Sequence, residues 1–301
     1  MIEGAASLSW IPLFDFPLEW AALSLLAGAC LYSERAGFSG LGIEGSVAAA
    51  MLGLILGYQW TADYLAALGV AAGFAVAFAL AMGTLLQIMR ADMAVGSFVL
   101  SLVPLCGLGL LVRSGSFAIF GTKPYPGIVT GTVFEGTYAE DLIASPVLLS
   151  APLVVALAGW ILWRTPFGLR IRAFGENPDL RVPGLSPLLH RFGGLAIGSL
   201  IAVPAAALLL RANPGNPPAG VGFLALGCVI AGRWSLIAAI LFAVGPALLR
   251  AARPYGETFG SFGIAAEMAP FLLVLLYLVI LARRALRLAP TSQSRLDPDT
   301  L

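Results

Sequence analysis

The side chains most able to do chemistry gather in one polar stretch, TPFGLRIRAFGENPDLRVPGLSP, at positions 165–187. Only 11% of this chain is charged, yet the stretch and its flanks hold five of its 17 Lys and Arg residues and its single His. They are Arg164, Arg170, Arg172, Arg181, His190 and Arg191. Such a cluster either fixes the topology of an apolar chain by contacting lipid phosphates or forms a docking surface for a protein partner.

Local signals inside the stretch predict a short helix. Asn177 is a favourable N-cap for a helix whose first residue is Pro178, and Asp179 adds a negative charge near the positive end of that helix. Pro183 and Gly184 then end it. A short helix flanked by arginines between two apolar segments contributes little to packing, which favours the docking interpretation.

The composition shows what kind of chain must position this helix. With 59% apolar residues and a mean hydropathy of +0.92, the chain is far more apolar than a soluble domain, which averages about half apolar and about a quarter charged residues. We therefore predict an integral membrane protein. The 35 Gly and 20 Pro residues lie within apolar runs, where close helix packing and broken helices use them.

Charge and side-chain chemistry exclude several classes of protein. A net charge of +1 argues against nucleic-acid binding, which needs a basic stripe. Cys30, Cys106 and Cys228 each lie in an apolar run and are predicted to be small buried residues rather than a disulfide or metal set. With His190 as its single histidine and no clustering of Cys or His, the sequence predicts no zinc site. The N-terminus lacks a basic region, so we expect no cleaved signal peptide.

The predicted fold is all-α: a polytopic transmembrane helix bundle of about eight to ten spans, each needing about 20 apolar residues. The segment 220–233 is too short to cross by itself and is predicted to be a discontinuous helix. The candidate spans are 12–31, 41–58, 64–88, 93–112, 143–163, 192–210, 220–233, 235–252 and 268–284.

Lys and Arg in the short loops predict the orientation. The 164–191 loop and the C-terminal ARRALR segment should both face the cytoplasm, which requires the short segment to complete a crossing. The 113–142 loop and the N-terminus then lie outside, as do Arg250 and Arg253, the two cations that fit this arrangement least well. Residues 1–289 are predicted to form one transmembrane domain, and 290–301 a disordered tail.

Three motifs resemble one family. FGLRIRAFGENP at 167–178 is similar to T-P-x-G-x-x-x-R-A-x-G-E-N-P, the coupling segment of permease subunits in the sugar and nucleoside branch of ABC importers, relatives of the branched-chain amino-acid permeases. ERAGFSGLGIEGS at 34–46 and PAGVGFLALGCVIAGRWSLIAAIL at 218–241 resemble two further segments of that family. The chain departs from the pattern at Gly40, where the family has Asn, and at Pro183, where its coupling segment is shorter.

The resemblance implies two groups of functional residues. Coupling to an ATPase is expected to involve Gly168, Arg170, Arg172, Gly175, Glu176, Asn177, Pro178, Asp179 and Gly184. The translocation pathway is expected to involve Gly40, Gly42, Glu44, Gly45, Gly220, Gly222 and Phe223.

The roles of Glu44 and of the pair Arg233 and Trp234 leave alternatives open. A carboxylate in an apolar run is costly unless it faces a cavity or a partner. Glu44 is therefore either a pathway residue or a structural acceptor that bonds backbone amides at a helix break or pairs with Arg35. Arg233 and Trp234 either anchor the short helix at the membrane interface or gate the inner mouth.

The resemblance also implies the partners. The sequence contains no G-x-x-x-x-G-K-[ST] phosphate loop, so ATP is expected to be bound and hydrolysed by a separate cytosolic ATPase, with no cofactor or enzymatic activity in this chain. A second permease subunit, identical or related, an extracytoplasmic solute-binding protein and the lipid bilayer of a bacterial cytoplasmic (inner) membrane complete the system. Nucleosides are the expected substrate, with simple sugars as the alternative.

Two other classes of function are weaker alternatives. An ion-coupled secondary transporter would need ionisable relays deep in the bundle, and beyond Glu44 the span interiors hold almost no acids or histidines. A membrane enzyme would need a nucleophile, a metal cluster or an acid pair at the interface, and the sequence suggests none.

Overall fold

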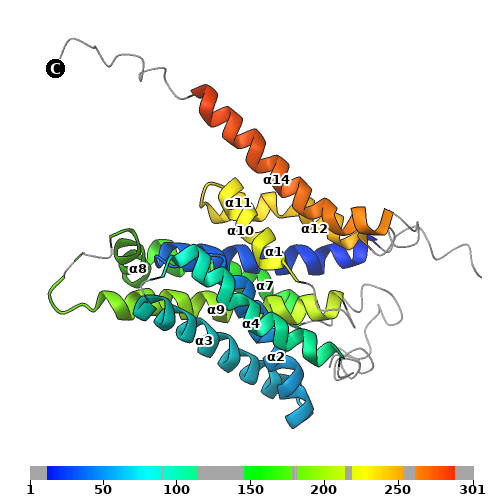
Figure 1. The fold of residues 1–301 in the computed structure, drawn as a ribbon, viewed down its shortest axis with the longest axis horizontal. Helices are drawn as coiled ribbons and strands as arrows, with labels where there is room; N and C mark the ends of the chain where they lie inside the picture. The colour runs from blue at the N-terminus through cyan, green and yellow to red at the C-terminus, as the bar shows by residue number, and fades with distance from the viewer. Residues whose placement is uncertain are drawn as a thin grey trace, which may run out of the picture.

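The computed structural model describes residues 12–89, 91–113, 146–177, 180, 182–213, 219–253 and 262–288. All regular structure in these residues is helical, which confirms the predicted all-α class (Figure 1). The helices are α1 (Pro12–Arg35), α2 (Gly42–Thr61), α3 (Tyr64–Met89), α4 (Met93–Arg113), α7 (Pro146–Arg164), α8 (Pro166–Glu176), α9 (Pro187–Ala212), α10 (Val221–Ala231), α11 (Leu236–Phe242), α12 (Val244–Ala251) and α14 (Phe262–Leu288).

Helices α1 and α9 form the centre of the bundle. In the most apolar 18-residue segments of α1 and α9, 78% and 72% of the residues are buried. In the corresponding segments of α3, α4 and α7, only 22% to 28% of the residues are buried. Figure 1 shows α1 and α9 running along the long axis with the other helices around them. A helix that is apolar on all sides and enclosed by others lies in the core, and the helices around it expose one apolar face.

Small residues allow the outer helices to approach closely. Ala67, Ala71 and Ala75 form a buried stripe on α3 at a spacing of four residues, which places them on one face. A Cβ at Gly53 or Gly57 of α2 would lie 2.6 or 2.9 Å from the Cα of Ala71 or Ala67. The α2–α3 contact therefore depends on glycine opposite alanine, as in other membrane helix pairs.

Among the described residues, five helices are long and apolar enough to cross a membrane: α1, α3, α4, α7 and α9. Helix α10 has 11 residues and extends only about 16 Å, against a bilayer core of about 30 Å. The prediction of a short, discontinuous helix near 220–233 is therefore confirmed.

The predicted span 235–252 is an apolar helical stretch, Leu236–Ala251, but it is interrupted at Ala243 and shorter than a full span. Helix α11 ends at Phe242 and α12 begins at Val244. Pro246 explains the break. It has no N–H to donate, and its ring would clash with the carbonyl four residues earlier, which belongs to Phe242.

The short polar helix is also displaced from its predicted position. Helix α8 occupies Pro166–Glu176, Asn177 is its C-cap rather than an N-cap, and the described residues from 177 to 186 are not helical. Pro178, Asp179 and Arg181 lie outside the described residues. Thr165 and Pro166 provide the same helix-start signals 12 residues before Asn177 and Pro178. Packing against the bundle selects the earlier pair.

The bundle has two ends, which we define by their residues. The α8 end contains α8, Arg35 in the last turn of α1 and Arg233 after α10. The far end contains Glu19 and Arg250, which are in contact. In Figure 1 the last turns of α14 (red) point toward the side of α8. The side of the membrane on which each polar segment lies stays a prediction.

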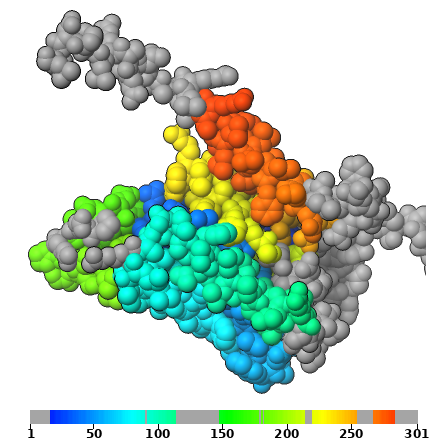
Figure 2. All heavy atoms as spheres, viewed as in Figure 1, coloured from blue at the N-terminus to red at the C-terminus, as the bar shows by residue number. Residues whose placement is uncertain are grey.

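Outer faces of the bundle are apolar. Helices α3 and α4 form a broad surface in Figure 2. Separately, the apolar side chains of Phe98, Val99 and Val103 on α4 are exposed. Cys106 is also exposed on α4, so the prediction that all three cysteines are buried is wrong for this one, whereas Cys30 and Cys228 are buried. An exposed apolar face of this kind meets lipid or another membrane chain.

Candidate functional site

Helix α8 begins with a hydrogen-bonded cap and packs directly on the end of α7. The Thr165 hydroxyl accepts a hydrogen bond from the Gly168 N–H at 3.2 Å, and Pro166 occupies the first turn. A Cβ at Gly168 would overlap the carbonyl oxygen of Ile161. Glycine is therefore required at position 168, because the chain turns back so tightly after α7.

The other end of α8 is fixed to the end of α1. A Cβ at Gly175 would overlap the carbonyl oxygen of Arg35, so glycine is required here as well. Next to it, Glu176 accepts a hydrogen bond from Arg35 Nη1 at 2.9 Å. Gly168 and Gly175, both predicted coupling residues, thus face the bundle and fix the position of α8.

Arg191 on α9 holds the turn that follows α1. Its Nε and Nη2 donate to the carbonyl oxygens of Ala36 and Gly37, each at 3.1 Å, and its guanidinium lies 5.1 Å from the centre of the Phe38 ring. Gly37 has φ +81°, a conformation that side chains rarely adopt. Helix α8 therefore contacts the end of α1, and α9 is hydrogen-bonded to the turn that follows α1.

The predicted cation cluster does not form one uniform basic surface. His190 is buried against the rings of Phe167 and Phe174, and its Nδ1 lies 2.8 Å from the Ser186 carbonyl oxygen. Arg172 is half-buried and stacks 4.5 Å from the Trp163 ring centre. These side chains position α8 rather than present charge to a partner.

What α8 presents outward is a small mixed surface. Leu169 is 59% exposed, and Arg170 beside it is also exposed. Gly184 has φ +78°, and nothing lies within 4 Å of a Cβ added there. Backbone conformation rather than close packing therefore explains Gly184.

Glu44 joins the start of α2 to the start of α10. Its Oε1 accepts from the Gly220 N–H at 2.5 Å and its Oε2 from the Gly222 N–H at 2.6 Å, and the side chain is buried. The first N–H groups of a helix have no partner within that helix, so an anion is favourable there. Glu44 therefore acts as a structural acceptor that bonds backbone amides at a helix break. It does not pair with Arg35, which instead pairs with Glu176.

The glycines around Glu44 lie at helix contacts. A Cβ at Gly222 would be 2.7 Å from the Glu44 backbone nitrogen, and one at Gly40 would be 2.7 Å from Leu226 Cδ1. Added atoms at Gly42 and Gly45 would meet Met82 and Phe78 at 2.5 Å. The larger family residue Asn would therefore not fit at Gly40 without a shift.

Phe223, on the first turn of α10, is only half-buried. Its ring lies 5.6 Å from that of Phe98 on α4, centre to centre. The structure brings Glu44, Gly220, Gly222 and Phe223 together at the start of α10, and their role in the pathway stays a prediction.

The far end holds a buried polar network that the sequence analysis missed. Arg250 Nε donates to Glu19 Oε2 at 2.8 Å and Nη2 to Glu19 Oε1 at 3.2 Å. Asn213 Nδ2 donates to Glu19 at 3.0 Å, and Arg253 donates to Asn213 Oδ1 at 3.1 Å. Glu19 carried the same signal as Glu44, a carboxylate within an apolar run. Its presence explains why Arg250 and Arg253 fitted the predicted orientation poorly.

The polar side chains of the candidate site mainly join helices to one another. Within the described residues no group of three or more His, Cys, Asp or Glu side chains could hold a metal ion. At the α8 end, Arg35, Glu176 and Arg191 hold α8 and the α1–α2 turn against the bundle. Glu44 joins the start of α2 to the start of α10.

Curated relatives share sequence with this chain. The guanosine ABC transporter permease protein NupQ of Bacillus subtilis is 27% identical over 291 residues, covering 88% of this chain and 90% of the relative. The putative glucose ABC transporter permease protein TsgC13 of Haloferax volcanii is 29% identical and covers 78% and 76%. The nucleoside ABC transporter permease protein NupC of Lactococcus lactis is 35% identical, over 30% of each chain.

A solved structure shares the fold. PsaBC from Streptococcus pneumoniae, in complex with Fab, matches with a TM-score of 0.54 at 15% identity, over 89% of this chain and 90% of that one. At this identity the likeness concerns the fold alone. Residues 17–282 match the family described as branched-chain amino acid transport system / permease component. Because that match covers most of the sequence, the chain belongs to this family of transport permeases.

Proposed function

We propose that this chain is the membrane-spanning subunit of an ABC importer and that α8 is the surface on which a separate cytosolic ATPase docks. One observation carries the proposal: a capped helix at the end of the bundle is anchored by glycines, an ion pair and stacked arginines, yet leaves Leu169 and Arg170 exposed. An element fixed so firmly, with an outward face of its own, is suited to receive a partner.

Displacement of α8 would reach the bundle through the α1–α2 turn. Arg35 and Glu176 join that turn to α8, and Arg191 joins it to α9. In the proposed cycle, the ATPase closes on ATP, displaces α8 and shifts the bundle between outward-open and inward-open states. The α8 end then faces the cytoplasm of a bacterial cell, and an extracytoplasmic solute-binding protein delivers the substrate at the far end.

We place the translocation pathway beside the start of α10, where Phe223 and Phe98 meet. A short helix with an unwound approach exposes backbone groups to a cavity, a common arrangement in transporters. The apolar face of α4 next to it would meet a second permease subunit, identical or related, which completes the pathway.

Nucleosides are the proposed substrate, because two relatives carry nucleoside or guanosine in their names. A simple sugar is the alternative, which the relative named for glucose supports.

The docking proposal is tested by reversing one exposed charge. Arg170→Glu should abolish co-purification of the ATPase encoded with this chain and should lower uptake, while the permease is still inserted and monodisperse. Arg283→Glu, the same change at an exposed arginine on α14, is the matched control and should retain the complex. Undiminished association of the Arg170→Glu variant with the ATPase would refute the docking role of α8.

Substrate is tested separately, by uptake of radiolabelled guanosine and glucose into cells expressing the whole system. Guanosine uptake that unlabelled nucleosides reduce and glucose does not is the expected result. The opposite pattern would assign the chain to sugar transport without affecting the docking test.

A further inference from the structure

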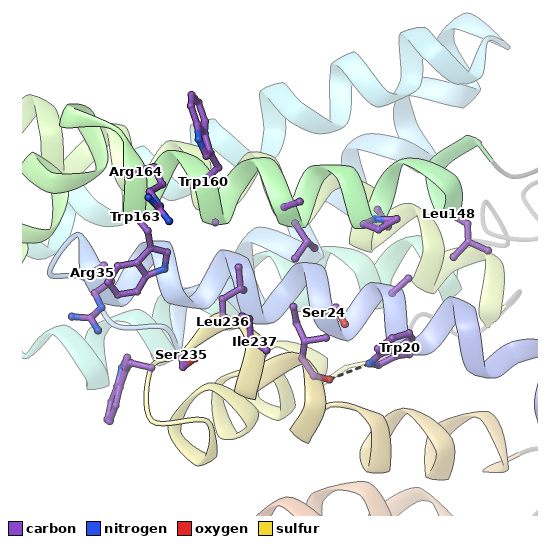
Figure 3. Close-up of a pocket in the computed structure, with 18 of the residues that line it drawn as sticks. Trp20, Ser24, Arg35, Leu148, Trp160, Trp163, Arg164, Ser235, Leu236 and Ile237 are labelled. Carbon is purple, nitrogen blue, oxygen red and sulfur yellow. Dashed lines mark hydrogen bonds between the residues drawn. The ribbon is translucent and has the colours of Figure 1, made fainter.

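A long groove runs between α1, α7 and α11 and encloses about 1090 Å³ (Figure 3). Most of its lining is apolar, with Ala21 on α1, Ala156 on α7 and Ile237 on α11 among the residues of its walls. A nucleoside or sugar would leave its hydroxyl groups without partners against such walls. The groove is therefore suited to a hydrocarbon chain.

All the cations that line the groove are at its α8 end. They are Arg35, Arg164 and Arg233, and no Asp or Glu is among the lining residues. Figure 3 shows Arg35, Trp163 and Arg164 together at one end, with Trp20 and Leu148 at the other. The groove thus has a basic, aromatic mouth and an apolar interior.

Two of these arginines can bind an anionic ligand, because no carboxylate among the described residues neutralises them. Arg35 is paired with Glu176, whereas Arg164 and Arg233 are exposed and make no ion pair within the part of the chain described here. Glu34, which lies beside the mouth, already accepts a hydrogen bond from the Gly40 N–H at 2.7 Å. The net charge at the mouth is therefore positive.

An unusual backbone places Arg233 at the mouth. Arg233 and Trp234 have φ +53° and +57°, and consecutive residues other than glycine are rarely left-handed. Their N–H groups donate to the carbonyls of Ile230 and Val229, each at 3.0 Å. Such strain persists where the surrounding structure imposes it, and it is concentrated at functional sites.

We propose that the groove binds one anionic phospholipid from the leaflet at the α8 end. An acyl chain lies between α1, α7 and α11, the phosphate contacts Arg164 and Arg233, and the Trp163 and Trp234 indoles lie at the headgroup level. Basic pockets between membrane helices bind anionic headgroups, and Trp is enriched at that depth.

The dimensions agree with one leaflet. Half of the bilayer core is about 15 Å, which corresponds to about ten residues of α7. Counted back from Arg164, this length reaches Val154, so that the acyl chain passes Gly159 and Ala156. The assignment to the cytoplasmic leaflet rests on the orientation in the proposed function, and lipid binding itself does not depend on the ATPase.

The test uses the purified full-length permease, without the ATPase, and native mass spectrometry with added phosphatidylglycerol or phosphatidylcholine. Phosphatidylglycerol should bind more tightly. Arg164→Gln and Arg233→Asn should each weaken its binding about fivefold, and the double variant about 30-fold, from about 1 kcal/mol per basic residue near a phosphate. Asn tolerates the left-handed conformation at position 233, which protects the fold. Arg283→Gln, which removes an exposed charge on α14, should leave the affinity unchanged.

Filling the groove tests the acyl chain. Ala156→Trp should reduce the amount of bound lipid severalfold, whereas Ala77→Trp, on the exposed face of α3, should not. Equal affinities for the two lipids, or unchanged binding in the Ala156→Trp variant, would overturn the proposal. A disulfide between two copies carrying Ile237→Cys, formed in membranes, would show that a second copy of the chain occupies the groove instead. Loss of ATPase association would not change these readouts.

Discussion

Breaking the buried pair between Glu19 and Arg250 should be far more damaging than removing it entirely. Two hydrogen bonds of 2.8 and 3.2 Å join these side chains, of which Glu19 is only 3% and Arg250 only 5% exposed. Glu19→Leu or Arg250→Met alone leaves one buried charge without its partner and should lower the free energy of unfolding by about 3–5 kcal/mol. The double variant removes both charges and should lose at most about 1–2 kcal/mol.

The rest of the network permits this test. After both changes, Asn213 Nδ2 still donates to the Leu209 carbonyl at 3.3 Å, and its Oδ1 still accepts from Arg253 at 3.1 Å. No further buried polar atom of Asn213 therefore loses all its partners, and the cost of the double variant reflects the ion pair itself.

Reversible unfolding in mixed micelles, followed by tryptophan fluorescence, measures the four forms of this cycle. The summed losses of unfolding free energy in the two single variants should exceed the loss in the double variant by at least about 3 kcal/mol. Arg35 and Glu176 form the control pair, because their side chains are 25% and 67% exposed and such pairs contribute about 0–1 kcal/mol. A double variant as unstable as the two singles combined would refute the reasoning.

Three further changes distinguish packing, capping and hydrogen bonding in the same unfolding assay. Gly175→Ala should cost about 1–3 kcal/mol because its methyl group meets the α1 backbone, whereas Gly73→Ala, with nothing within 4 Å of the added Cβ, should gain about 0.5–1 kcal/mol. Thr165→Ala should cost about 1 kcal/mol by removing the N-cap of α8, and hydrogen exchange should rise at the Gly168 amide. Glu44→Gln should cost about 1.5–3 kcal/mol, because one of two charge-assisted bonds is lost; an unchanged stability would show that the carboxylate is not needed there.

Hydrophobic runs were sufficient to predict most helices, because each is apolar for about the thickness of a bilayer. The starts of α3 and α4 agree with the predicted positions 64 and 93. The break between α11 and α12 was not predicted, although Pro246 was visible in the sequence. A proline inside an apolar run can kink a helix or end it, and the surrounding helices decide which occurs.

The position of the short helix α8 shows where prediction from local sequence signals fails. Thr165–Pro166 and Asn177–Pro178 carry nearly the same start signal. What distinguishes them is tertiary: Gly168 and Gly175 have no side chain, so the segment between them can lie directly on the backbones of α7 and α1. This contact joins residues more than 130 positions apart, such as Arg35 and Glu176, and no local pattern contains it.

The candidate site was predictable where a residue type conflicts with its surroundings. Glu44 was identified because a carboxylate in an apolar run needs partners. Glu19 satisfies the same criterion and was overlooked. His190 was grouped with the arginines, whereas two phenylalanine rings enclose it, a fact that depends on how α8 folds back on α9.

The two hydrogen bonds between Glu44 and the amides at the start of α10 determine which helices must move as one unit. Helix α10 is tied at its start to α2, and α2 follows directly from the turn that α8 and α9 hold. A shift imposed on α8 is therefore expected to cross the bundle sideways, through α2, and to arrive at the unwound entrance of α10 without passing along the length of α9.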